Sequence, residues 1–389
     1  MDYRGQIKNY IQNHQEEIID TWKTLVDSPS KVNRKEDLDV CCGKLAELFK
    51  NLGFKVTRIK TGPANGDVIS GILGEDRPGK PVMFTGHYDT VPLPGEHPFR
   101  FDEEGHVRGL GSLDMKGGIT IAYHVCKMLN EIGWQERPIK ILFVGDEETG
   151  HDGGNAAEVI AKEAAGMLCA FNMETGLLSN AVCIGRKGDI KTTMTVHGIA
   201  AHSGNAFLQG RSAIAEAAKK IPLLEALTDL NKGTTVAVTL IEGGTVFNSI
   251  PPICKMTIDS RIKQVSERQR IFDSMKEIAE MNFIDGCTTE YICQEYMPPF
   301  ESSKENRRLA QLISDVSESL GQGKMNAVEL GGGSDASHIA MIGVPALCSM
   351  GVRGEYNHTE NEYAVKESVF ERAELLANAV IHIHEFEQN

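Results

Sequence analysis

The sequence predicts an α/β fold of two domains, in which a smaller α+β unit is inserted into a larger sheet domain. At 389 residues the chain exceeds what one typical hydrophobic core accommodates. Strand and helix patterns alternate over the first half, which is typical of an α/β sheet. From about Gly188 the order becomes βαββαβ, the pattern of a ferredoxin-like unit. We therefore expect residues 1–187 and 298–389 to form one domain and residues 188–297 the insert.

The elements of the larger domain follow from the spacing of apolar residues. Helical spacing predicts two helices at the start of the chain, over residues 3–25 and 38–52, and Gly53 ends the second. Apolar runs bounded by turn residues predict the first group of strands, at residues 55–59, 68–73, 81–85, 139–144 and 167–173. Helices are predicted between them at residues 119–132 and 155–163.

The insert is predicted from the same two patterns. Its strands are expected at residues 190–196, 234–241, 253–262 and 288–296, and its helices at residues 212–227 and 267–284. After Pro298 and Pro299 the larger domain resumes with a helix over residues 306–320. A strand at residues 344–350 and a final helix over residues 366–386 then complete it.

A histidine and an aspartate end the apolar run MFTGHYDTVP. His87 and Asp89 are two residues apart, and strand side chains alternate, so both should lie on one side of the strand. His87 would bind a metal through one ring nitrogen, while Asp89 accepts a hydrogen bond from the other. Taken alone, the pair also fits a solvated turn.

Further acids and another imidazole follow apolar runs elsewhere in the chain. They are Asp114 in GLGSLDMKGG, the acids 146–148 after IKILFVG, Glu174 after MLCAFNM, and His358 in YNHTENEY. Singly, the acid triplet fits a helix start and His358 fits a surface loop. Strand ends converge in an α/β sheet, however, and several acids brought together repel each other unless a cation neutralises them.

The ligand types indicate which metal is expected. Carboxylate and imidazole without thiolate favour zinc, with Co²⁺ or Mn²⁺ as substitutes. The set is larger than one tetrahedral ion needs, so a pair of ions bridged by a carboxylate and a water is expected. One of the adjacent Glu147 and Glu148 would then be a ligand and the other a general base, an arrangement suited to hydrolysis.

Several motifs in one order resemble a known family. They are GHYDTVP, GSLDMKGG, GDEETG, NMETG, HGIAAHSG, GGTVFNSIP, DSR, GGGSDAS and NHTENEY. The sequence resembles the co-catalytic zinc peptidases that include glutamate carboxypeptidases, acetylornithine deacetylase, succinyl-diaminopimelate desuccinylase, aminoacylases and tripeptide peptidases. It looks most similar to the glutamate carboxypeptidase-like members. The resemblance implies a zinc-exopeptidase-like α/β/α catalytic domain with an inserted ferredoxin-like lid and dimerisation domain.

The resemblance also implies roles for the residues of the metal site, carried over motif by motif. His87 and Glu174 would hold one zinc, Glu148 and His358 the other, and Asp114 would bridge the two. Asp89 would orient His87, and Glu147 would be the general base.

Outside the metal site the resemblance implies a substrate-binding set. His202 would reach across a dimer to polarise the scissile carbonyl, and Asn248 and Arg261 would hold the substrate carboxylate. A guanidinium suits that task because its planar fork donates two parallel hydrogen bonds. Gly333 and Ser334, in the loop GGGSDAS, would line the substrate. The structural alternatives are a turn for His202 and for this loop, and for Arg261 a surface salt bridge with Asp259.

Composition limits the class of protein. No apolar stretch approaches twenty residues and the first residues are polar, so neither a membrane span nor a signal peptide is expected, and the cytoplasm is the default location. Nine cysteines without paired spacing argue against a disulfide framework. A net charge of −14 with dispersed Lys and Arg makes nucleic acid a poor partner.

We therefore expect a homodimeric di-zinc hydrolase that cleaves an amide or peptide bond next to a free carboxylate. Its substrate would be a small peptide or an N-acyl amino acid. One alternative is a tripeptide-type aminopeptidase on the same scaffold, which recognises a free amine. The other is a catalytically silent binding protein, against which the presence of Glu147 argues.

Overall fold

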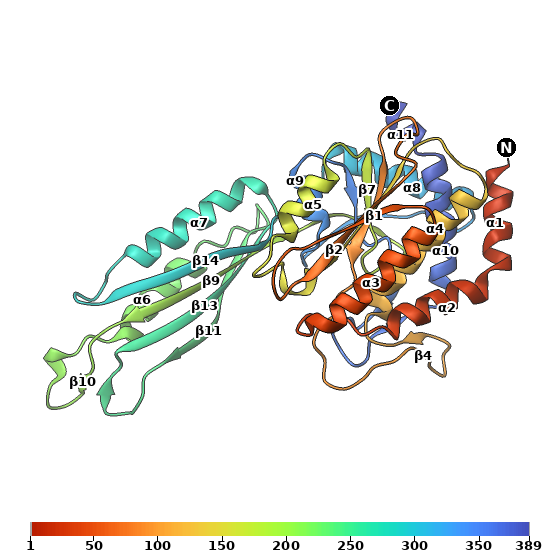
Figure 1. Cartoon of the computed structure of the whole chain (residues 1–389). Helices are drawn as coiled ribbons and strands as arrows, with labels where there is room; N and C mark the ends of the chain where they lie inside the picture. Colours follow the sequence, from red (N-terminus) through yellow and green to blue (C-terminus); the bar gives the residue numbers. More distant parts are fainter. Residues whose placement is uncertain (1, 389) are drawn as a thin grey trace. The chain divides into compact units, whose positions relative to one another are not determined.

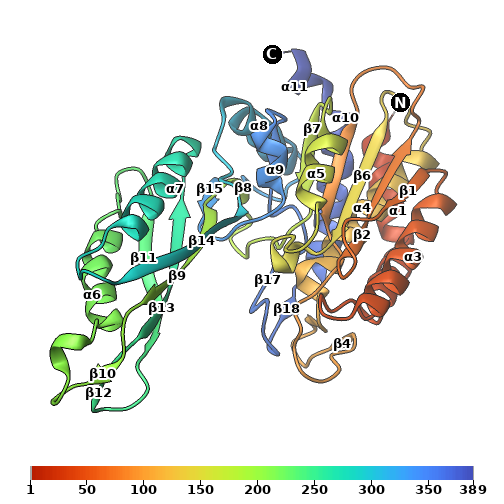
Figure 2. The same ribbon diagram turned by 60° about the vertical axis from the view of Figure 1, so that its left-hand side comes forward.

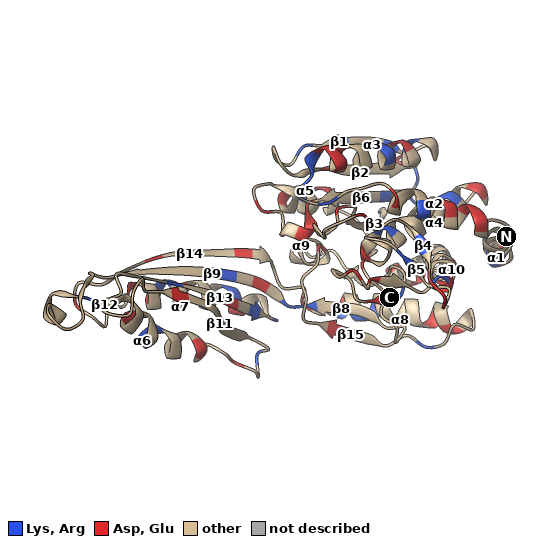
Figure 3. Ribbon diagram, turned by 90° about the horizontal axis from the view of Figure 1, so that it is seen from below, with Lys and Arg blue, Asp and Glu red and all other residues tan. Residues whose placement is uncertain are grey.

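The computed structural model describes residues 2–388, which divide into two compact units (Figure 1). Unit 1 contains the residues up to Gly185, Ser302–Leu330 and the residues from Ser334 onward, and unit 2 contains Arg186–Glu301 and Gly331–Gly333. Lys and Arg are interspersed with Asp and Glu in each unit (Figure 3). Within the described residues, none of the helices has both the length and the apolar composition that a bilayer crossing requires.

A six-stranded sheet forms the centre of unit 1. Its strand order is β1 (Lys55–Ile59), β2 (Gly66–Leu73), β6 (Ile139–Gly145), β3 (Val82–His87), β7 (Cys169–Asn172) and β16 (Ala346–Leu347). The pairs β3–β6, β3–β7 and β7–β16 are parallel, and β1 and β2 form an antiparallel edge. Every residue of β3 is buried, as expected for a parallel strand covered on both faces.

Helices cover both faces of this sheet. The first set along the chain is α1 (Tyr3–Asn13), α2 (Gln15–Val26), α3 (Lys35–Asn51), α4 (Gly117–Glu131) and α5 (Ala156–Ala164). The second set is α8 (Lys304–Ser319), α9 (Ala336–Met341), α10 (Glu367–Ile381) and α11 (His384–Gln388). Figure 2 shows α5 and α9 on one face and α4 and α10 on the other. The sheet and its two helix layers enclose a core that includes Trp22, Phe84 and Trp134.

Two of the predicted long helices are interrupted. The helix expected over residues 3–25 breaks at His14, whose backbone N–H and ring Nδ1 both bond the Tyr10 carbonyl, at 3.0 and 2.8 Å. The break lets Ile7 and Ile18 reach the same core from two helices. The final helix, expected over residues 366–386, is also divided: α10 ends at Ile381 and α11 begins at His384. The strand expected at residues 344–350 is shorter than predicted and consists of the two residues of β16.

Short strands were not predicted. β4 (Arg100–Phe101), β5 (Val107–Arg108), β17 (Gly354–Glu355) and β18 (Tyr363–Ala364) form a sheet of two-residue strands, and β8 (Val182–Arg186) pairs with β15 (Ala327–Leu330). In the strands of two residues, an alternating pattern is too short to be visible in the sequence.

Unit 2 is an antiparallel sheet with two helices packed on it. The strand order is β11 (Thr235–Gly243), β13 (Ile253–Ile262), β9 (Gly188–His197) and β14 (Thr288–Met297). The helices α6 (Ala213–Glu225) and α7 (Val265–Glu280) share one core with the sheet. Along the chain the order is βαββαβ, as predicted. A separate pair of two-residue strands, β10 (Ala201–His202) and β12 (Ser249–Ile250), carries His202.

Candidate metal centre

Three strands of unit 1 deliver side chains to one edge of the six-stranded sheet. His87 is the last residue of β3, Glu174 lies just beyond β7, and Glu148 lies just beyond β6. Because these strands are parallel neighbours, their carboxyl ends lie side by side. The sequence predicted that these residues follow strands, and the neighbouring positions of β6, β3 and β7 in the sheet bring them together.

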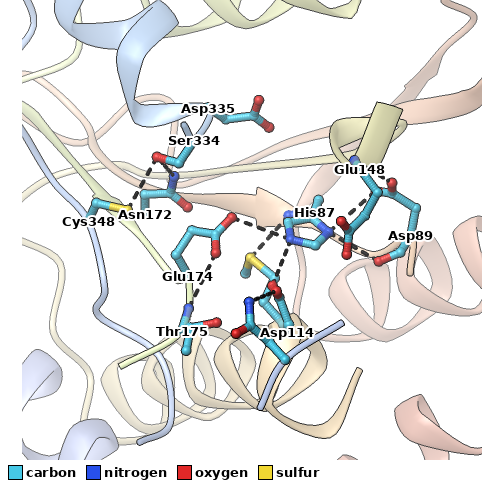
Figure 4. Close-up of polar contacts among 12 residues, drawn as sticks. His87, Asp89, Asp114, Glu148, Asn172, Glu174, Thr175, Ser334, Asp335 and Cys348 are labelled. Carbon is cyan, nitrogen blue, oxygen red and sulfur yellow. Dashed lines mark hydrogen bonds and ion pairs between the residues drawn. The ribbon is translucent and has the colours of Figure 1, made fainter. Parts of the chain in front are cut away.

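The first cluster consists of His87, Asp114 and Glu174. The Nε2 atom of His87 lies 3.2 Å from Asp114 Oδ1 and 3.3 Å from Glu174 Oε1 (Figure 4). All three residues are buried. An imidazole and two carboxylates therefore converge on one point.

The second cluster consists of Asp114, Glu148 and His358. The Nε2 atom of His358 lies 3.2 Å from Asp114 Oδ2 and 3.1 Å from Glu148 Oε2. Asp114 thus gives one carboxylate oxygen to each cluster, and Asn357 donates to its Oδ2 at 2.9 Å. In each cluster the possible ligand atoms lie within 4.8 Å of one another. One imidazole nitrogen and two carboxylates form a donor set that zinc accepts, so the residues present fit a dinuclear centre.

The backbone carbonyl and the carboxylate of Asp89 each contact a different residue of the site. Its backbone carbonyl accepts a hydrogen bond from His87 Nδ1 at 3.1 Å, while its carboxylate Oδ1 lies farther away, at 3.4 Å. The other carboxylate oxygen accepts from the backbone N–H of Glu148 at 3.0 Å. The main chain of Asp89 therefore orients the ring of His87 so that Nε2 faces Asp114 and Glu174, and its side chain fixes the start of the Glu147–Thr149 turn.

The carboxylates of the two clusters shift the pKa values of the histidines that they contact. Burial alone would lower the pKa of His87, but hydrogen bonds with Asp114, Asp89 and Glu174 raise it well above its usual range. Hydrogen bonds with Asp114 and Glu148 raise the pKa of His358 to about 11. Burial opposes ionisation of Asp114, yet hydrogen bonds from His358 and His87 lower its pKa well below the ordinary value. The raised pKa values of both imidazoles and the lowered pKa of Asp114 have one cause, the concentration of carboxylates, and positive charge at this place would offset it.

The two adjacent glutamates differ in their contacts. Glu148 contacts His358, and burial raises the pKa of its carboxyl group to about 6. Burial also raises the pKa of Glu147 well above its ordinary value; His87 opposes this shift, and the charges of Glu174 and Asp335 add to it. A carboxyl group with a raised pKa beside a metal centre is suited to exchanging protons near neutral pH.

Glu362 is a residue of this centre that sequence reasoning missed. Its carboxylate accepts hydrogen bonds from the backbone N–H groups of Leu113 at 2.8 Å, Asp114 at 3.2 Å and Gly111 at 3.3 Å. Burial, with the charge of Asp114, raises the pKa of Glu362 to about 7. It holds the loop that presents Asp114, and only its place in NHTENEY, four residues after His358, could have drawn attention to it.

The loop GGGSDAS divides between the two units. The hydroxyl of Ser334 is buried, 3.4 Å from Asn172 Nδ2 and 3.3 Å from Cys348 Sγ (Figure 4). Gly333 belongs to unit 2, and its carbonyl accepts from Arg186 at 3.3 Å. The substrate contacts expected for both residues remain predictions.

The other predicted substrate residues lie in unit 2. His202 is exposed, and its Nδ1 accepts from the backbone N–H groups of Gly204 and Asn205 at 3.1 and 3.2 Å. Because Nδ1 accepts, Nε2 carries the hydrogen of the neutral ring. Asn248 precedes β12, the strand that pairs with β10. Arg261 forms ion pairs with Asp259 at 3.1 Å and with Asp189 at 3.2 Å. The salt bridge with Asp259 that the sequence offered as an alternative to carboxylate binding is therefore formed in the structure.

Comparison with known proteins gives one consistent result. Residues 83–382 match the model of Peptidase family M20/M25/M40. Carboxypeptidase G2 of Pseudomonas sp. (strain RS-16) is 28% identical over 377 residues, covering 95% of this chain and 89% of that protein. Succinyl-diaminopimelate desuccinylase 2 of Ruegeria sp. (strain TM1040) is 30% identical, covering 82% of this chain and 84% of that protein.

Solved structures share the fold of the whole chain. The aminopeptidase PepT from Bacillus cereus superposes with a TM-score of 0.82 at 23% identity, covering 95% of this chain and 99% of that one. An M20 family metallo-carboxypeptidase from Sulfolobus solfataricus superposes with a TM-score of 0.78 at 17% identity, covering 94% and 98%.

Proposed function

Because the chain belongs to Peptidase family M20/M25/M40, we propose that it is a metal-dependent hydrolase that cleaves an amide or peptide bond next to a free carboxylate. Its substrate would be a small peptide or an N-acyl amino acid, which makes it a carboxypeptidase or a deacylase. One observation carries most weight: the two oxygens of Asp114 face two separate imidazole-containing clusters.

We propose two zinc ions as the cofactor, with Co²⁺ or Mn²⁺ as substitutes. His87, Asp114 and Glu174 would hold one ion, and Asp114, Glu148 and His358 the other. Metal ions held by these residues would polarise the scissile carbonyl and lower the pKa of a bound water to about 7. Binding of the ions would displace any proton from the ring nitrogens that face them.

The residues around the ions would carry the proton steps. Glu147 takes a proton from the attacking water while the water oxygen forms a bond to the carbonyl carbon. The same carboxyl group then delivers the proton to the leaving nitrogen as the C–N bond breaks. Burial raises the pKa of Glu147, which favours the form that carries the proton between the two steps. Asp89 keeps His87 and Glu148 in place through the contacts already described.

Unit 2 would supply the substrate contacts. The Nε2–H of His202 is oriented by two backbone donors on the opposite nitrogen, which suits it to donate to the scissile carbonyl oxygen. Arg261 and Asn248 would hold the substrate carboxylate, after Arg261 exchanges its contacts with the acids for the ligand. We further propose a homodimer formed through unit 2, in which His202 serves the partner's metal centre.

One observation favours a second candidate. Asp189 and Asp259 flank Arg261, and two carboxylates at this position would equally accept the free amino group of a tripeptide. A tripeptide-type aminopeptidase is therefore the alternative. A silent binding protein is less favoured because Glu147 is present and in an environment that prepares it as a base.

Substrate panels would separate the two candidates. Zinc-loaded protein is offered N-acyl amino acids and N-blocked dipeptides in one series and unblocked tripeptides in another, and amine release is measured. Turnover of blocked substrates with a free carboxylate supports the carboxypeptidase or deacylase function. Turnover confined to unblocked tripeptides supports the alternative, and no hydrolysis by fully loaded protein contradicts both.

A further inference from the structure

Unit 1 contains a third cluster of potential metal ligands, which shares no residue with the two at the Asp114 centre. It consists of His151, Asp335 and His338, whose ligand atoms lie within 4.8 Å of one another. His151 follows the Glu147–Thr149 turn, and the other two come from the start of α9. Asp335 lies in the loop GGGSDAS, but neither it nor the two histidines have a role in the proposed catalytic set.

His151 is held between two buried carboxylates. Its Nδ1 lies 2.8 Å from Asp146 Oδ1, and its Nε2 lies 2.8 Å from Asp335 Oδ1. Asn65 donates to the other oxygen of Asp146 at 3.0 Å, which fixes that carboxylate in turn. A carboxylate on one ring nitrogen is the support that metal-binding histidines commonly have.

The backbone of His151 is also unusual. Its φ of 61° lies in the left-handed region, which costs free energy for a residue other than glycine. Its N–H bonds the Asp146 carbonyl at 3.0 Å, so main chain and side chain are tied to the same residue. The surrounding contacts therefore determine where the imidazole points.

Two buried polar atoms of the cluster have no partner among the described residues. They are Asp335 Oδ2 and His338 Nε2. Asp335 is only 1% exposed, so water outside the protein does not solvate its second oxygen. The rings of His151 and His338 are 5.4 Å apart between centroids. An unpaired buried carboxylate oxygen is costly, and a cation held by the Asp335 carboxylate and the His338 ring would offset that cost.

We propose that His151, Asp335 and His338 form a third divalent cation site, separate from the Asp114 centre and suited to zinc. Two imidazole nitrogens and one carboxylate oxygen are a zinc donor set that leaves a fourth position for water. Asp146 supports His151 from outside the site. The entering ion replaces the hydrogen between His151 Nε2 and Asp335 Oδ1, and this proton leaves to solvent.

The site would have a mechanical consequence within unit 1. It joins the loop that follows Glu147 and Glu148 to the first turn of α9. An ion bound only by the folded chain stabilises it by mass action. Occupancy should therefore raise the melting temperature even when the Asp114 centre is already filled.

The test counts zinc ions per chain. Untagged protein is stripped with a chelator, titrated with Zn²⁺, and analysed for bound zinc by equilibrium dialysis and mass spectrometry. The parent chain should bind three ions and show a rise in melting temperature with the third. His338→Gln and Asp335→Asn should each bind two. His338→Gln should fold normally because His338 Nε2 has no hydrogen-bond partner among the described residues.

Two controls identify the ion that is lost. His382 and His384 lie with their rings 6.2 Å apart at the exposed end of the chain, where they could capture zinc nonspecifically. The double variant His382→Ala/His384→Ala should still bind three ions. His358→Ala removes a ligand of the Asp114 centre and should bind fewer ions while retaining the one that His338→Gln loses. A parent chain that saturates at two ions overturns the third site, as does equal zinc content in the parent and both cluster variants; the dinuclear proposal survives either result.

Discussion

The metal centre of unit 1 and the tip of unit 2 around His202 are built in opposite ways. At the centre, His87, Asp114 and Glu174 are buried and each contacts at least one other member. At the tip, which we define as residues 199–210 and 244–249, most residues are exposed to solvent, and Phe247 and Leu208 are 101% and 87% exposed. The difference teaches that the residues of the centre already contact one another within a single folded unit, whereas in our proposal the tip acts only once substrate and a partner chain are bound.

The largest effects are expected from substitutions of two adjacent residues of the centre, Glu147 and Glu148. Glu147→Gln should lower kcat by about 10²- to 10⁴-fold because no carboxylate remains to move the proton. Its zinc content should be unchanged. Glu148→Ala should lose activity and also bind less zinc, because its carboxylate contacts His358. Kinetics and metal analysis on the same samples check both, and normal turnover of Glu147→Gln would remove Glu147 as the base.

A substitution at the tip should lower the catalytic rate without changing the stability of the protein or its zinc content. His202→Ala should reduce kcat by about 10²- to 10³-fold if the ring stabilises the developing oxyanion. Zinc content and melting temperature should not change, because the side chain is exposed. His197→Ala is the matched control, since this histidine is also in unit 2 and 41% exposed. Full activity of His202→Ala would exclude His202 from the catalytic set.

Arg261 should show its role in substrate affinity. Arg261→Lys keeps the charge but loses the planar fork, so KM for a substrate with a free carboxylate should rise roughly tenfold or more while kcat changes less. The same substitution should leave an amide-capped version of that substrate unaffected. An equal effect on both substrates would show that Arg261 acts through Asp189 and Asp259 instead.

The smallest expected effect concerns the pH dependence of stability without metal. The pKa of His358 in the folded chain is raised to about 11, so the stability its proton provides is full below the unfolded value near 6.5. It is lost as pH rises toward 11, and His87 shifts in the same direction. Melting temperatures of chelated protein should therefore fall between pH 7 and 10 more than those of zinc-loaded protein. Parallel curves would contradict the exchange of protons for metal.

Much of the framework could be predicted because it depends on local patterns. The strands at Lys55–Ile59 and Ile253–Ile262 were placed at their observed bounds, since both have strong β-forming runs. The clustering of His87, Glu148 and Glu174 follows from the rule that parallel strands end at one edge.

What could not be predicted depends on contacts between distant residues. Glu362 bonds backbone groups about 250 positions away, and His151 meets Asp335 across 184 positions. Neither contact leaves a local pattern. The break at His14 was missed because apolar spacing continues on both sides of it.

Asp114 serves two neighbours with one side chain, and this has a consequence for how the centre assembles. The first ion to arrive would fix the orientation of the ligand that the second requires. Loading should then be cooperative, with few molecules caught half filled. Extraction of either ion would loosen the other, so the protein would pass between an inert and a competent form in a single step.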